Sequence, residues 1–126
     1  MANTRLPVEL TSEVENLPGA IWLGSESRAM MLVEFYDYNC PYCRVAAKAI
    51  HGLMQSARDL RLGLVNNAIL SPGSVEAAKV ELALQRMGKP MSVYGFHRRM
   101  FERRGIVDGA RALVLNDSPL RQNDRF

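Results

Sequence analysis

The apolar and polar positions of this chain follow two different periods, which together predict an α/β fold. Three short apolar runs, at residues 21–23, 30–36 and 60–65, have the length and composition of β-strands. The run at 30–36 is almost continuously apolar, as is typical of a strand covered on both faces of a sheet. From Pro41 the apolar residues recur at steps of three and four, which indicates a helix. A β-α-β unit is therefore expected, with the helix beginning directly after the second strand.

Helical periods continue in the second half of the chain. We expect helices at about 75–87 and 91–104, separated by a Gly-Lys-Pro break, and a short helix capped by Asp108 that ends at Leu115. No further strand is expected there. A length of 126 residues suits one domain, since single domains commonly have ~100–150 residues. We divide this domain, residues 1–126, into a lead-in (1–19), the β-α-β unit with its cysteine motif (20–70), a helical segment (71–115) and a polar tail (116–126).

Composition and charge narrow the class of protein further. The chain is 48% apolar and 23% charged, as in an ordinary globular protein, and no apolar run approaches the ~20 residues that span a bilayer. Its start lacks the pattern of a secretory signal, so we expect either a cytoplasmic protein or one from which an export signal has been removed. The net charge of +3 comes from residues 88–126, most densely from Arg98, Arg99, Arg103 and Arg104. Because no aromatic residues interleave with these arginines in a nucleic-acid-binding motif, we interpret them as a solvated helix face and expect no nucleic-acid partner.

The motif that carries chemistry is Cys40-Pro41-Tyr42-Cys43. Two cysteines three residues apart at a helix start lie on one turn, where the helix dipole and backbone N–H groups favour a thiolate. Cys40 would be the exposed nucleophile that attacks a disulfide, and Cys43, more buried, would resolve the mixed disulfide. Pro41, which suits the first helical position, and Tyr42 would tune the reduction potential of the pair.

Two structural alternatives compete with this redox interpretation. A Cys-x-x-Cys pair can also be half of a zinc site, but His51 and His97 are the only nitrogen ligands and neither belongs to a second ligand pair. A purely structural disulfide is a poor explanation, since so small a loop constrains the unfolded chain little. We therefore predict a redox pair with no metal and no cofactor, and surface or hydrogen-bonded positions for the two histidines.

An acidic residue, Glu34, precedes Cys40 by six positions on the same strand candidate. A buried carboxyl group there would have a raised pKa and could move protons for the buried thiol. A carboxylate that faces water at the strand edge is the alternative, and the sequence leaves both open. Asp37, near the end of the strand, is interpreted as a turn or cap residue.

The segment Phe35-Tyr36-Asp37-Tyr38-Asn39-Cys40-Pro41-Tyr42-Cys43-Arg44 resembles the bacterial DsbA family of thiol:disulfide oxidoreductases, within the thioredoxin superfamily. The similarity continues more weakly over 68–78 and 94–105. This resemblance implies a thioredoxin-like fold with an inserted helical segment. It also implies that Cys40 is the nucleophile, Cys43 the resolving cysteine and Glu34 the buried acid. The implied substrates are cysteine-containing proteins of the periplasm, with a redox partner that reoxidises or reduces the pair.

That family normally continues into a cis-proline loop, two strands and a last helix, and this chain is expected to stop before them. Pro119 is not assigned as the cis-proline, because it follows a serine and no strand pattern comes after it. A sheet with an unprotected edge favours a homo-oligomer that completes it or a partly open form. Glutaredoxin-like activity, disulfide isomerase activity and a non-catalytic remnant or interaction module remain as alternatives.

Overall fold

The fold is mixed α/β, as the sequence predicts. A computed structural model describes residues 7–24 and 30–116. Its elements in chain order are α1 (Val8–Glu15), β1 (Ile21–Leu23), β2 (Met30–Tyr36), α2 (Pro41–Ser56), β3 (Leu60–Asn66), α3 (Pro72–Met87), α4 (Pro90–Glu102) and α5 (Gly109–Asn116). The expected helix at 75–87 begins at Pro72, because Ser71 caps it by accepting a hydrogen bond from the backbone of Ser74. Pro119 lies outside the described residues.

The strands form one sheet in the order β1-β3-β2. β3 pairs with β2 in parallel, from Met30 opposite Leu60 to Tyr36 opposite Asn66, and it pairs with β1 in the antiparallel direction. A parallel pair needs a crossover, and α2 supplies it. The predicted β-α-β unit is thus confirmed.

The expectation that strand 30–36 is covered on both faces is wrong. β2 lies at an edge of the described sheet, and Phe35 is 57% exposed. The central strand is β3, in which Leu62 and Leu64 are fully buried. Apolar content alone does not distinguish these positions, because the order of strands depends on pairing between residues far apart in the sequence.

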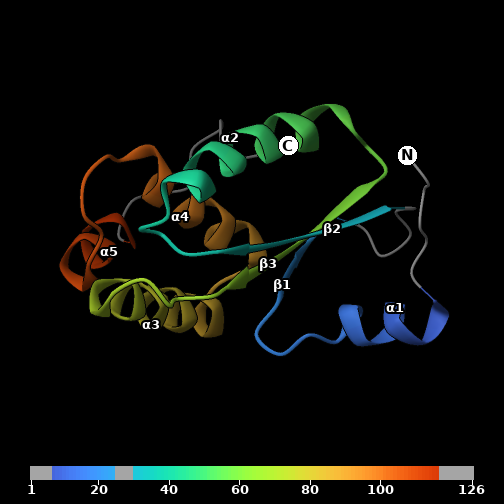
Figure 1. Ribbon diagram of the computed structural model, residues 1–126, viewed down its shortest axis with the longest axis horizontal. Coiled ribbons are helices and arrows are strands. Elements are labelled where there is room, and N and C mark those ends of the chain that lie inside the picture. The colour runs from blue at the N-terminus through green and yellow to red at the C-terminus, as the bar shows by residue number, and fades with distance from the viewer. Residues whose placement is uncertain (1–6, 25–29, 117–126) are drawn as a thin grey trace.

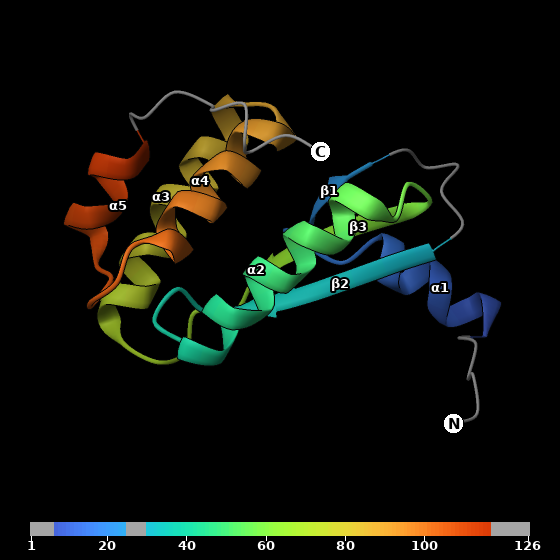
Figure 2. The same ribbon diagram turned by 90° about the horizontal axis from the view of Figure 1, so that it is seen from above.

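The helices are distributed unevenly around the sheet. α2 runs along the sheet, whereas α3, α4 and α5 gather beyond one end of it (Figures 1 and 2). α4 packs against α2, α3 and α5 and is the most buried helix of the set. No described helix is both long enough and apolar enough to cross a membrane. The start of α2, which carries the cysteines, therefore lies next to the helical segment.

An aromatic cluster joins the sheet to the helical segment. Tyr36 and Tyr38, at and after the end of β2, contact Phe101 of α4 with ring centroids 6.0 and 4.9 Å apart. Tyr38 also meets Phe96 edge to face, at 5.9 Å. Such tilted and edge-to-face pairs are favourable arrangements of aromatic rings. The residues that lead into the cysteine motif are thereby held against α4.

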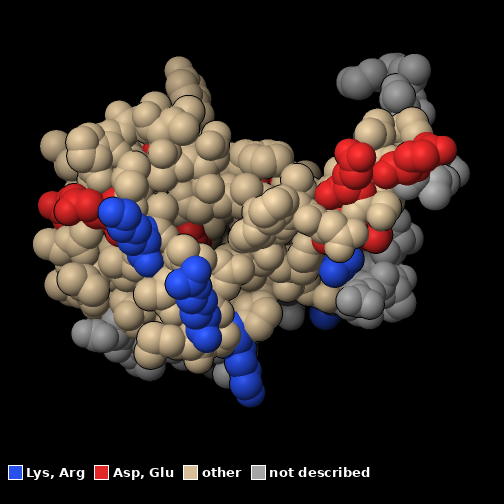
Figure 3. Space-filling model, turned by 90° about the horizontal axis from the view of Figure 1, so that it is seen from below, with Lys and Arg blue, Asp and Glu red and all other residues tan. Residues whose placement is uncertain are grey.

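Charged residues are only partly where the sequence places them. Acidic side chains gather over α1 on the face shown in Figure 3, while the basic ones there stand apart from one another.

The interpretation of the arginine run as a solvated helix face is wrong for Arg99. Its side chain is buried, and its Nε donates a hydrogen bond to the carbonyl of Leu115 at 3.3 Å. Arg99 thus connects α4 with the last turn of α5.

Candidate active site

The two cysteines stand at the start of α2, as predicted. Cys40 is the N-cap residue, Pro41 occupies the first turn, and the backbone N–H of Cys43 donates to the Cys40 Sγ at 3.3 Å. Both cysteines are free and partly buried, although the sequence predicts an exposed Cys40. In the loop before the helix, the Cys40 N–H donates to the carbonyl of Asp37 at 3.0 Å.

The inner thiol is strongly biased toward its protonated form. Burial raises the pKa of Cys43 to about 11, and the neighbouring Cys40 and the charge of Glu34 act in the same direction. A hydrogen bond from the backbone of Asp37 opposes them only in part. Cys43 is therefore a neutral thiol near pH 7, while the Cys40 sulfur accepts a hydrogen bond at the positive end of the helix. The two sulfurs thus have different electrostatic surroundings, and the roles predicted for them stay predictions.

Glu34 is buried, so the alternative of a water-facing carboxylate is excluded. Its side chain lies on β2, and its Oε2 is 3.4 Å from the Nε2 of His97 on α4. Neither carboxylate oxygen accepts a hydrogen bond. Glu34 is thus a buried carboxylate that faces His97 of α4, and its catalytic role stays a prediction.

The network of contacting polar side chains extends from His97 to Glu81, a residue that the sequence analysis does not single out. His97 Nδ1 is 3.4 Å from the hydroxyl of Tyr38, which donates to Glu81 Oε1 at 2.8 Å. Glu81 also accepts from the Tyr36 hydroxyl at 2.5 Å and, through Oε2, from the side chain of Asn66 at 2.5 Å. Burial, followed by the charge of Glu81, raises the pKa of both tyrosines, so their hydroxyls remain donors.

The sequence pattern of helices α3 and α4 could have singled out Glu81 and His97. Glu81 lies four residues after Ala77 on α3, and His97 lies four residues after Val93 on α4. Ala77 and Val93 are core residues, so both polar residues interrupt an apolar face. His51 is buried too, with its Nδ1 2.6 Å from the Tyr94 hydroxyl. The histidines therefore occupy the hydrogen-bonded positions that the sequence allowed.

Asp37 does more than cap a turn. Its two oxygens accept hydrogen bonds from the backbone of Asn39, Ile69 and Leu70 and from the hydroxyl of Ser74. Burial alone would raise the pKa of Asp37, but these four donors outweigh it and lower the pKa. The ionised carboxylate thus fastens the cysteine loop to the segment that follows β3.

Asn39, next to Cys40, ties the same loop to the helical segment. Its amide nitrogen donates to the carbonyl of Val107 at 2.9 Å, and its Oδ1 accepts from the backbone N–H of Val107 at 2.8 Å. The amide also donates to the hydroxyls of Ser71 and Ser74. The position of Cys40 is therefore set by contacts with residues more than 30 positions away in the sequence.

A shallow cleft of about 140 Å³ opens beside the thiols. Its exposed apolar residues include Phe35, Ile69 and Leu70. Tyr42, between the two cysteines, is 84% exposed. In the described parts of the chain, no three His, Cys, Asp or Glu side chains are placed to hold a metal ion, so the zinc alternative has no ligand set there. The cleft thus presents apolar surface next to the two thiols.

Comparison with known proteins adds independent findings. No family model matches the chain. It is 32% identical over 94 residues to disulfide bond formation protein D of Bacillus subtilis, covering 70% of this chain and 41% of that protein. A thioredoxin-like oxidoreductase from Silicibacter pomeroyi has a similar structure, with a TM-score of 0.70, 34% identity, and coverage of 78% of this chain and 55% of that one.

The thiol-disulfide exchange protein α-DsbA2 from Wolbachia pipientis shares the fold, with a TM-score of 0.75, 20% identity, and coverage of 92% of this chain and 61% of that one. This chain spans less than half the length of the curated relative that it matches. The resemblance drawn from the motif is confirmed, as is the thioredoxin-like fold class. The chain is similar in sequence and fold to DsbA-like oxidoreductases.

Proposed function

We propose that this chain, which is similar in sequence and fold to the DsbA-like oxidoreductases, exchanges disulfides with cysteine-containing proteins through Cys40 and Cys43. One observation carries the proposal: Cys40 caps α2 with its sulfur 3.3 Å from the backbone N–H of Cys43. That N–H and the helix dipole stabilise negative charge on the Cys40 sulfur, which is the charge that forms when the sulfur is the nucleophile or the leaving group.

The proposed cycle consists of two thiol–disulfide exchanges. With the Cys40–Cys43 disulfide formed, a substrate thiolate attacks the Cys40 sulfur, a mixed disulfide forms and Cys43 leaves as a thiolate that takes up a proton. A second substrate thiolate then attacks the substrate sulfur and releases Cys40 as a thiolate. The substrate loses two electrons and two thiol protons, and the protein is reduced by two electrons to the free thiols. The reverse sequence reduces a substrate disulfide.

Glu34 is proposed as the group that moves the proton of Cys43. In the reducing direction, Cys43 must lose its proton before it can attack the mixed disulfide, and a thiol with a pKa of about 11 rarely does so unaided at pH 7. The charge of Glu34 contributes to this raised pKa, and its oxygens have no hydrogen-bond donor. Contact with His97 places a second titratable group behind the carboxylate.

Pro41 and Tyr42 are proposed to set the reduction potential, since the residues between the two cysteines control the helix start that stabilises the thiolate. The proposed setting is an oxidising compartment, the bacterial periplasm, with a redox partner that reoxidises or reduces the pair. One structural neighbour is described as a periplasmic thioredoxin-like protein of Salmonella enterica. Cell fractionation tests the compartment: a protein found only in the cytoplasm contradicts it.

Equilibration of the chain with glutathione buffers of graded potential, followed by thiol trapping and mass measurement, tests the proposed function. We expect a reversible two-electron couple, toward the oxidising end near about −120 mV if the protein acts as an oxidase. We also expect Cys40→Ser to abolish exchange with a peptide dithiol and Cys43→Ser to accumulate a mixed disulfide. A pair that never forms an intramolecular disulfide contradicts the proposal and favours a binding role.

A further inference from the structure

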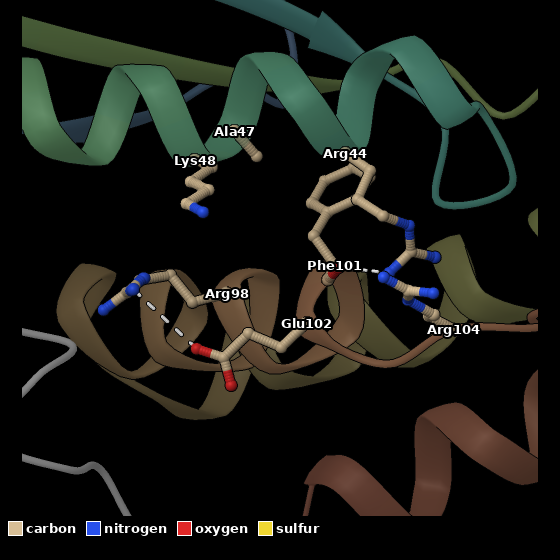
Figure 4. A pocket seen from close by; sticks show the side chains of 7 residues that line it. All are labelled: Arg44, Ala47, Lys48, Arg98, Phe101, Glu102 and Arg104. Carbon is tan, nitrogen blue, oxygen red and sulfur yellow. Dashed lines mark hydrogen bonds and ion pairs between the residues drawn. The ribbon is translucent and has the colours of Figure 1, made fainter.

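A second cavity, separate from the cleft at the thiols, lies between α2 and α4. Its volume is about 420 Å³, and it is lined by Arg44, Ala47, Lys48, Arg98, Phe101, Glu102 and Arg104 (Figure 4). Four of these seven residues are cationic, and one is acidic. We refer to it as the α2/α4 pocket. Its size is within the range of pockets that hold small ligands or parts of peptides.

Positive charge comes from both walls of this pocket. In Figure 4, Lys48 extends from α2 into the space between the helices, and Arg98 lies across from it on α4. Glu102 is 3.7 Å from Arg98 and offsets part of its charge. Among the described residues, no carboxylate forms an ion pair with Lys48 or Arg104. The pocket therefore holds an excess of positive charge around the aromatic ring of Phe101.

Arg44 shows that this excess is held in place by the fold. Its guanidinium donates to the backbone carbonyls of Phe101 and Arg103, which fixes the cation between the helices without neutralising it. Burial lowers the pKa of Arg44, and the charges of Arg104 and Arg111 lower it further. Cations that repel one another in a partly enclosed space would be stabilised by an anion bound among them.

The pocket is close to the reactive sulfur along the helix. Arg44 and Lys48 lie four and eight residues after Cys40 on α2, which places them roughly 6 and 12 Å along the axis at ~1.5 Å per residue. An extended peptide advances ~3.3 Å per residue. A side chain two to four residues away from a substrate cysteine can therefore reach the pocket while that cysteine is at Cys40.

We propose that the α2/α4 pocket binds an acidic side chain of the substrate, two to four residues from its reactive cysteine, and so selects acidic cysteine-containing segments. This inference rests on the proposed function, because it assigns a substrate class to the same cysteine. The inference also changes the interpretation of the C-terminal arginines as a solvated face. Arg98 and Arg104 contribute to the proposed binding site, whereas Arg99 is buried outside it.

A single chemical step tests the inference. The full chain with Cys43→Ser is labelled at Cys40 with nitrothiobenzoate, and a peptide thiolate then attacks the Cys40 sulfur. A peptide–Cys40 disulfide forms, and coloured nitrothiobenzoate leaves as the thiolate. Peptides with Glu or Gln two to four residues from a single cysteine are compared. Each peptide is also reacted with a reference compound, the mixed disulfide of free cysteine and nitrothiobenzoate. Dividing the rate with the protein by the rate with this compound corrects for the intrinsic reactivity of the peptide thiol.

We expect the Glu peptide to react about threefold to fivefold faster than the Gln peptide at low salt, as one or two partly exposed ion pairs would produce. The preference should disappear in about 1 M salt. Lys48→Gln with Arg104→Gln should bring the ratio close to one, whereas Lys79→Gln with Arg86→Gln, an equal charge change on α3 outside the pocket, should not.

A ratio near one in the parent protein would overturn the inference, as would an equal loss of preference in the control with Lys79→Gln and Arg86→Gln, which would indicate net charge alone. These outcomes are distinct from failure of the proposed function. Displacement of nitrothiobenzoate needs only an accessible Cys40, so the peptide preference is measured even if the complete redox cycle does not run.

Discussion

The two cysteine side chains differ in environment although only two residues separate them. Cys40 accepts a backbone hydrogen bond at the helix start, whereas burial and nearby negative charge raise the pKa of Cys43 to about 11. Roughly one Cys43 thiol in ten thousand is then ionised at pH 7. The proposed nucleophile and resolving thiol are thus separated by their electrostatic surroundings.

Alkylation should reveal this difference. In the reduced protein at pH 7, we expect iodoacetamide to modify Cys40 at least about tenfold faster than Cys43, because only thiolates react. Peptide mapping by mass spectrometry measures the two rates. In the Cys40→Ser variant the remaining Cys43 should still react more slowly than Cys40 does in the parent protein, because burial, the largest cause of its raised pKa, persists. Equal rates for both cysteines in the parent protein would contradict the assignment of roles.

The raised pKa of Cys43 also makes the stability of the folded, reduced protein depend on pH. Because the pKa of Cys43 is higher in the folded reduced protein than its ordinary value of 9.0, the folded state holds this proton more tightly. The stabilisation is present below pH 9 and should be lost as the pH rises through about 11. Urea unfolding of the reduced protein at pH 8 to 11 measures this loss. Cys43→Ser should show a shallower decline over the same interval, and parallel declines would argue against the shift.

Glu34 is expected to control the second half of the cycle. Glu34→Gln keeps the shape of the side chain but removes its basicity, so attack by Cys43 on a mixed disulfide at Cys40 should slow by about tenfold or more. Rapid-quench trapping of the mixed disulfide measures this step. Glu76→Gln, which removes an exposed carboxylate on α3 away from both the cleft and the α2/α4 pocket, is the matched control and should leave it unchanged. An unchanged rate in Glu34→Gln would remove Glu34 from the proposed mechanism.

At the scale of elements, one carboxylate joins three segments of the fold. Glu81 on α3 accepts hydrogen bonds from Tyr36 at the end of β2, from Tyr38 in the cysteine loop and from Asn66 at the end of β3. All of these contacts lie at the end of the sheet where α3, α4 and α5 gather. Together with the contact between His97 of α4 and Glu34 of β2, these hydrogen bonds join the helical segment to the sheet.

Glu81→Ala should therefore lower the free energy of unfolding by about 3 kcal/mol or more, because buried donors lose a charged acceptor. Glu81→Gln retains part of the network and should lose less. Urea unfolding monitored by circular dichroism measures both. Lys79→Ala, at an exposed position of the same helix, should change the free energy by less than about 0.5 kcal/mol. A loss in Glu81→Ala no greater than in Lys79→Ala would show that the network contributes little.

At the scale of the whole molecule, β2 has an open edge in the described sheet. Phe35 on this strand is 57% exposed and lies in the cleft beside the cysteines. An unprotected edge with exposed apolar residues favours pairing with another chain. The homo-oligomer expected from the sequence remains a prediction, and the same surface is available to a substrate.

Sedimentation velocity over a range of concentrations tests this prediction. We expect self-association of the parent chain and a shift toward monomer in Phe35→Lys, because a charge at a strand edge disfavours pairing. Leu113→Lys, at an exposed position on α5, is the control and should not shift the equilibrium. A parent chain that stays monomeric at all concentrations, with cooperative unfolding, would contradict the prediction.

The bounds of the strands and of the helix that begins at Pro41 are predictable from the sequence to within a few residues. The strands at 21–23 and 30–36 and the helix start at Pro41 agree with the structure, because apolar period and proline geometry act over neighbouring residues. The cysteine motif was recognised for the same reason, since its spacing and helix position are both local. Glu34 could be named as a candidate, but its burial could not be decided.

The local pattern is therefore enough to predict the strands, the helices from Pro41 onward and the reactive pair at the start of α2, whereas α1 lies in the stretch expected as a lead-in. The folded structure is needed to see that β2 is an edge strand, that Glu34 meets His97, that Glu81 joins three elements, and that Arg44, Arg98 and Arg104 converge on one pocket. The physical reason is the distance along the chain over which each kind of interaction acts. Helix and strand formation depend on neighbours a few positions apart, whereas burial and charge clustering depend on which distant segments the fold brings together.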